Sequence, residues 1–143
     1  MEQRDYLQKQ IDQLGKVLAK VLTDLLGFKS KGQINDGIET TPETLKTQMD
    51  LDLEKLLTLA PDDFLNVLKQ DKKLSNEHLN QLAEILFIMA AAESDRSNRE
   101  KSIRLYEKCL TIYEHLQQED ENYSYNRYLR IKKVKDIFNE TKL

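Results

Sequence analysis

The sequence has few of the residues that interrupt helices or cross-link chains. Its 143 residues include four glycines, two prolines, one cysteine and no tryptophan. A single cysteine excludes an internal disulfide framework and is typical of a reducing compartment. Little glycine and proline, in a chain rich in Leu, Lys, Glu, Gln and Asp, favours helices. We therefore expect one helix-rich domain in the cytoplasm.

Long apolar runs and strong charge of one sign are also missing. The longest apolar run, residues 85–92, is too short to span a bilayer. The first ten residues, MEQRDYLQKQ, carry acidic residues where a signal peptide needs a basic start and an apolar run. The net charge of −3 gives no electrostatic reason to expect binding to nucleic acid or to an anionic membrane.

Residues 5–26 have the periodicity of one long amphipathic helix. The apolar positions fall within about a 100° arc of a helical wheel: Leu7, Ile11, Leu14, Leu18, Val21, Leu22 and Leu25. Most of these positions follow a short heptad spacing. This apolar stripe either docks on the rest of the same chain or pairs with a second copy, with a partner's helix or, least favoured, with a membrane surface. Leu14, Leu18 and Val21 are the candidate contact residues.

The remaining sequence divides into a linker and a bundle. Gly27 is a plausible helix stop, so residues 1–27 are expected to form the N-terminal helix and residues 28–41 a linker. Residues 42–143 then form about five helices. Pro42 and Pro61 each suit a first helical position, and Ser75 suits an N-cap before a helix at 76–93. That helix is apolar on more than one side, which predicts a central place in the bundle. No segment alternates with the period of a strand, and the fold class is therefore all-α.

The segment LYEKCLTIYEHL, residues 105–116, places the only cysteine near a histidine. Cys109 lies in the middle of a broad apolar arc, whereas His115 lies on the other side with Arg104, Lys108 and Thr111. The two side chains therefore cannot easily form a nucleophile–base pair. We expect Cys109 to be a small buried core residue and His115 to be solvated.

Residues 83–114 resemble a tetratricopeptide repeat. Bulky and small side chains stand at the positions that the repeat requires: Leu86, Met89 and Ala90 on its first helix and Ser102, Tyr106 and Cys109 on its second. The resemblance implies two closely packed antiparallel helices, here one hairpin within a small bundle. Glu93 departs from the pattern, which usually has an aromatic residue there. The whole chain is also similar to small uncharacterised bacterial helical proteins, a resemblance that implies no known activity.

Residues that commonly carry catalysis or cofactors are sparse. The two histidines, His78 and His115, lie on different predicted helices without a metal-binding spacing, and no glycine-rich phosphate loop occurs. Paired acids such as Asp62 and Asp63 suit the positive start of a helix. We expect no metal, no cofactor and no catalytic residue. An enzyme with a pocket around His78 is the least favoured hypothesis for the function.

The last helix carries the most distinctive surface. Residues 122–143 hold six basic and two acidic residues, net +4, which leaves −7 on residues 1–121. Tyr125 and Tyr128 lie beside lysines, away from the stripe expected to face inward: Tyr123, Ile131, Val134, Ile137 and Phe138. We predict a non-enzymatic protein-interaction module that binds a protein or peptide through Tyr125, Arg127, Tyr128 and Lys132. The alternatives are that the tyrosines only cover a flank of the bundle, or that they stack on nucleic-acid bases.

Overall fold

The protein is all-α, as the sequence predicts. The computed structural model describes residues 2–119 and 124–141, with side chains for residues 5–119 and 124–140. Within these ranges the chain forms seven α-helices and one π-helical turn, and no strand. The α-helices are α1 (Glu2–Ser30), α2 (Ile34–Met49), α3 (Leu53–Leu56), α4 (Pro61–Asn66), α5 (Asn76–Asp95), α6 (Arg99–Glu119) and α7 (Tyr125–Thr141); the π-helical turn η1 is Val67–Asp71.

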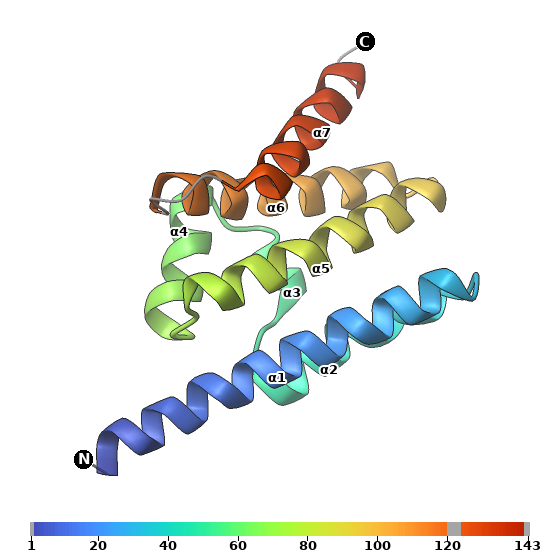
Figure 1. Cartoon of the computed structure of the whole chain (residues 1–143). Coiled ribbons are helices and arrows are strands. Elements are labelled where there is room, and N and C mark those ends of the chain that lie inside the picture. Colours follow the sequence, from blue (N-terminus) through green and yellow to red (C-terminus); the bar gives the residue numbers. More distant parts are fainter. Residues whose placement is uncertain (1, 120–123, 142–143) are drawn as a thin grey trace.

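The long helices are arranged in three layers around α5. The helices α1 and α2 lie side by side as one layer, α5 occupies the middle, and α6 lies on its other side (Figure 1). The helix α7 packs on α6 and projects from the bundle toward the C-terminus (Figure 1). The predicted central helix is confirmed, because α5 buries side chains on most of its surface. The core runs from α1 through α5 and α6 to Val134 of α7.

The predicted linker at residues 28–41 is wrong, and so is the helix stop at Gly27. The helix α1 continues to Ser30, Gly32 makes the turn with φ +70°, and α2 begins at Ile34. At Gly37 an added Cβ would lie 2.9 Å from Leu25 Cδ2, so the two helices approach closely there. Packing of α2 against α1 thus overrides the low helix propensity of these glycines.

The helix expected to begin at Pro42 also has different bounds. Pro42 lies inside α2 rather than at its start, and α2 ends where Asp50 adopts a left-handed conformation with φ 53°. The amide of Leu51 then donates to Leu45 O at 3.1 Å, which closes the helix end. Pro61, by contrast, occupies the first turn of α4 as predicted.

The start of α5 is held by a capping box that also reaches α1. Ser75 accepts from the His78 amide at 3.3 Å, and His78 Nδ1 accepts from the Ser75 amide at 3.1 Å. Since Nδ1 is an acceptor, Nε2 carries the proton and donates to Ile11 O at 3.0 Å. One ring nitrogen of His78 thus caps α5, and the other joins α5 to α1.

Candidate protein-binding surfaces

The α5–α6 hairpin is packed through small side chains. All six residues that carry the repeat resemblance are buried: Leu86, Met89, Ala90, Ser102, Tyr106 and Cys109. Ser102 Oγ donates to Ala90 O at 2.7 Å, and Cys109 Sγ donates to Ala83 O at 3.4 Å. Burial, with a smaller effect of Glu84, raises the pKa of Cys109 above its ordinary value, so the side chain is an inert thiol.

Glu93, the residue that departs from the repeat pattern, closes the hairpin loop. Its side chain is only 2% exposed and accepts from Arg96 Nη1 at 3.2 Å and from Asn98 Nδ2 at 2.7 Å. The Asn98 amide also donates to Glu93 O at 2.9 Å, and Ser97 between them has φ 63°. The connection between α5 and α6 is therefore a short turn over residues 96–98, to which Glu93 supplies hydrogen bonds.

A charged and aromatic cluster fixes the inner side of α7. Arg130 Nε donates to Glu84 Oε2 at 3.1 Å, and Tyr113 Oη donates to the same carboxylate. The Arg130 guanidinium also lies 4.2 Å from the Phe87 ring centroid. Burial is the main cause that raises the pKa of Tyr113, so its hydroxyl stays protonated and donates. The orientation of α7 is thus set by contacts with both α5 and α6.

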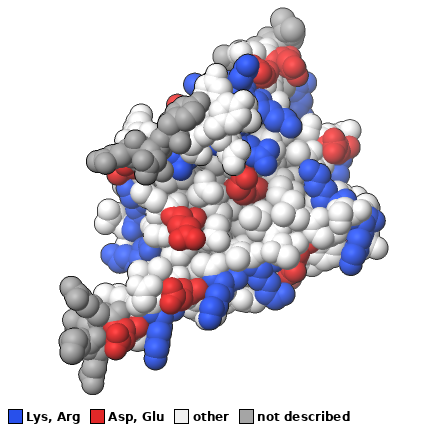
Figure 2. All heavy atoms as spheres, viewed as in Figure 1, with Lys and Arg blue, Asp and Glu red and all other residues white. Residues whose placement is uncertain are grey.

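The outer side of α7 carries three of the four predicted partner residues. Tyr125 and Tyr128 are 62% and 44% exposed, with ring centroids 6.3 Å apart in a stacked arrangement. Leu129 beside them is 43% exposed, and Lys132 is exposed one turn further along. We call these four residues the α7 patch. Figure 2 shows lysine and arginine side chains over α7 together with acidic ones, and side chains of both signs along α1.

Arg127, the fourth predicted partner residue, is not part of this patch. It is half-buried and its Nη1 donates to Gln117 Oε1 of α6 at 3.3 Å. The prediction placed Arg127 in one patch with the two tyrosines. On a helix, however, a residue two positions after Tyr125 points to the other side.

The apolar stripe of α1, from Leu7 to Leu25, divides into a docked part and an exposed part; we call it the α1 stripe. Leu18 and Val21 are buried in the chain's own core, and Leu14 packs against it while partly buried. These three candidate residues therefore dock within the same chain. Tyr6, Leu7 and Ile11 on the first turns are 66%, 55% and 40% exposed, and this end of α1 extends beyond α2 (Figure 1).

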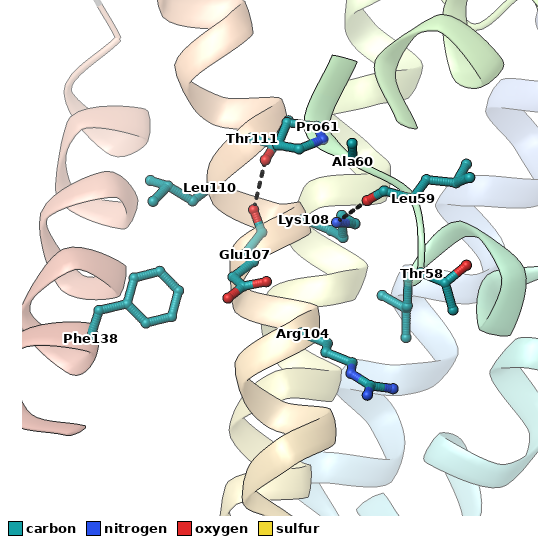
Figure 3. A pocket seen from close by; sticks show the side chains of 11 residues that line it. Thr58, Leu59, Ala60, Pro61, Arg104, Glu107, Lys108, Leu110, Thr111 and Phe138 are labelled. Atoms are coloured by element: carbon teal, nitrogen blue, oxygen red, sulfur yellow. Dashed lines mark hydrogen bonds between the residues drawn. The ribbon is translucent and has the colours of Figure 1, made fainter. Parts of the chain in front are cut away.

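A groove lies beside α6, between α7 and the segment before α4. We call it the α6 groove; its volume is about 700 Å³. Figure 3 shows Phe138 of α7 on one side, residues 58–61 on the other and Glu107 of α6 between them. Lys108 Nζ donates to Leu59 O across the groove at 2.6 Å (Figure 3).

The prediction that His115 is solvated is wrong, and Lys108, which lies on the same side of the helical wheel, is covered as well. Lys108 is 5% exposed, and His115 is half-buried with Nε2 at 3.0 Å from Lys69 Nζ. The wheel omitted the segment 57–71, which covers this side of α6. One signal was available: the apolar positions of α6 spread over about half of the helical wheel, wider than the stripe of a helix that is covered on one side only.

Burial, and then the Lys69 ammonium, lower the pKa of His115, while Glu119 acts weakly in the opposite direction. The imidazole is therefore neutral at pH 7, and its Nε2 accepts from the lysine. This pair links η1 to the end of α6.

Within residues 5–119 and 124–140, no group of three or more acidic, histidine or cysteine side chains is placed to hold a metal ion. None of the helices described combines the length and apolar character needed to cross a membrane. Comparisons of the chain with protein-family models, with curated proteins and with solved structures found no match.

Proposed function

We propose that the chain is a non-enzymatic helical interaction module that binds another protein through the α7 patch. The observation that supports this proposal most directly is the exposure of Tyr125, Tyr128 and Leu129 on one face of a helix whose opposite face is anchored. Tyrosine is enriched in protein interfaces, and a rigid helix loses little conformational freedom on binding.

The anchoring of α7 is what makes the patch a suitable binding surface. Val134 is fully buried and Arg130 pairs with Glu84, so the outer face has a fixed orientation. The repeat-like α5–α6 hairpin supplies the support, and we interpret it as a scaffold of the tetratricopeptide type. A cytoplasmic location, suggested by the single cysteine, belongs to the same proposal.

The charge beside the tyrosines indicates the chemistry of the partner. Lys132 and Lys135 are both exposed on the patch side, and no ion pair holds either lysine within the described residues. An acidic segment with apolar side chains would satisfy both the lysines and the rings. We therefore propose an acidic protein segment as the partner.

Photo-crosslinking from position 128 in an extract of the source cells tests this proposal. With benzoylphenylalanine in place of Tyr128, we expect protein adducts that disappear when Tyr125→Ser and Lys132→Glu are added. The control is Lys16→Glu, which makes the same charge change at an exposed position of α1. Adducts that ignore the patch substitutions would refute the proposal. Adducts that nuclease removes, together with oligonucleotide binding that weakens steeply as the salt concentration rises, would show that the α7 patch binds nucleic acid instead of protein.

A second candidate is association of two copies through the first turns of α1. Exposure of Tyr6, Leu7 and Ile11 in continuation of the docked α1 stripe favours it. Light scattering should give a dimer for the full chain and a folded monomer for Leu7→Glu with Ile11→Glu. Deleting residues 1–30 is a poor test, because Leu18 and Val21 belong to the core. A monomeric full chain would exclude this candidate.

A further inference from the structure

Lys108 is a buried cation without an anionic partner. Its side chain is 5% exposed; its ammonium donates to Leu59 O at 2.6 Å and lies 5.6 Å from the Phe64 ring centroid. Among the described residues no carboxylate forms an ion pair with it. An ammonium has three N–H donors, and a carbonyl and a ring face satisfy it poorly. The position is therefore suited to receive an anion.

The α6 groove gives this cation access to a ligand. Lys108 is one of the lining residues, and the volume of about 700 Å³ is in the range of sites that enclose a small ligand or a few side chains. The apolar part of the lining is spread over three segments of the chain: Leu59, Ala60 and Pro61 before and at the start of α4, Leu110 of α6 and Phe138 of α7. Figure 3 shows the Phe138 ring directed toward α6.

The charges of the lining favour an anion over a cation. Arg104 is the second cation of the lining. Its Nη2 donates to Glu100 Oε1 at 2.6 Å on the exposed side of α6. Glu107 is the one carboxylate in the lining; because Arg104 is already paired with Glu100, Lys108 is the cation that an added anion would meet. Glu107 and Lys108 are neighbours in sequence and therefore point about 100° apart on the helix.

We propose that the α6 groove binds an acidic peptide segment of a partner protein. A glutamate or aspartate of the segment pairs with the Lys108 ammonium, and a neighbouring aliphatic side chain packs against Leu110 and Phe138. A peptide fits better than an isolated small anion because the apolar walls lie on both sides of the cation. This site is separate from the α7 patch and does not depend on it.

Titration of the ¹⁵N-labelled full chain with two tetrapeptides tests the proposal. The probes are acetyl-Leu-Leu-Glu-Leu-amide and the same peptide with glutamine in place of glutamate. We expect saturable amide shifts at Leu59, Lys108 and Leu110, with the glutamine peptide binding about tenfold more weakly because it lacks the charge. Equal binding of the two peptides, shifts located elsewhere, or no saturable shift would overturn the proposal.

Three variants and one further probe locate the effect. Lys108→Met keeps the length of the side chain and should abolish the preference for glutamate, whereas Lys108→Arg should keep most of it. Lys132→Met, which removes an exposed lysine of α7, should change nothing at the groove. Hexanoate is the free-acid probe: if it binds as tightly as the glutamate peptide, the site takes a small acid and the peptide proposal is wrong.

Discussion

The hairpin of α5 and α6 contains two buried charged residues that differ in the partners that compensate their charge. Glu93 is 2% exposed and Lys108 is 5% exposed. Glu93 is paired with Arg96 and Asn98, three and five residues away. Lys108 reaches only a carbonyl oxygen 49 residues away and the face of a phenylalanine ring. Burial alone therefore does not separate a structural charge from a binding group; the identity of the partners does.

The difference also shows in where each residue lies. Glu93 lies beside the turn between α5 and α6, and both its carboxylate and its carbonyl oxygen accept hydrogen bonds from that turn. Lys108 borders the α6 groove, and no carboxylate among the described residues forms an ion pair with it. The following substitutions test this contrast, from the largest expected effect on stability to the smallest.

Glu93→Ala should lower the free energy of unfolding by about 3 kcal/mol, because it leaves Arg96 and Asn98 without their acceptor and opens a gap in a buried turn. Urea unfolding followed by circular dichroism measures the change. Glu93→Gln should lose about half as much, since its amide still accepts one hydrogen bond. A loss below about 1 kcal/mol for Glu93→Ala would mean that the turn does not depend on this carboxylate.

Glu84→Ala is an intermediate case, with an expected loss of about 1.5 kcal/mol. Glu84 accepts from Tyr113 and Arg130, yet both members of its ion pair are about one-third exposed, which weakens the interaction. Hydrogen exchange should show faster exchange of α7 amides, while α1 and α2 are unchanged. Uniform acceleration across all helices would instead show that Glu84 supports the whole core.

Lys108→Met should be neutral or stabilising by about 1 kcal/mol, because an unpaired buried charge is replaced by an apolar chain of similar length. The same urea unfolding experiment measures it beside Glu93→Ala. Opposite signs for the two variants would sharpen the contrast between a structural and a binding charge. A loss of more than about 2 kcal/mol would place Lys108 among the structural residues.

Acidification should weaken the fold slightly through His115. Its pKa is lower in the folded chain than the ordinary value near 6.5, so the unfolded chain binds more protons between the two values. The contribution is fully present above pH 6.5 and is lost as the pH falls through the folded pKa. The effect should be small, because the ring is only partly buried and solvent screens the Lys69 charge. Unfolding free energies from pH 7.5 to 5 should fall less for His115→Gln than for the parent chain, and identical slopes would contradict this role.

Local sequence signals predicted much of the fold. Ser75 and Pro61 mark helix starts by chemistry that acts within one turn, and both predictions hold. Gly27 and Pro42 failed as boundaries because the contact between α1 and α2 decides there, and no local signal reveals that Gly37 lies against Leu25. Tertiary packing therefore outweighed two residues that usually end or begin helices.

The candidate surfaces were predicted to the extent that one helix defines them. Tyr125, Tyr128 and Lys132 were correctly placed away from the inward stripe of α7, because only its own periodicity was needed. Arg127 and Lys108 were misplaced, since their positions depend on Gln117 of α6 and on Leu59 before α4. A helical wheel contains no information about a neighbouring segment that folds over its polar side.

The single cysteine, buried between α5 and α6, has a kinetic consequence. Cys109 is fully buried with Sγ directed at Ala83 O, and its thiol ionises with difficulty. A thiol reagent can react there only when the two helices separate, so the rate of labelling counts openings of this one hairpin. The natural chain therefore carries, without an engineered label, a reporter of how often this hairpin opens.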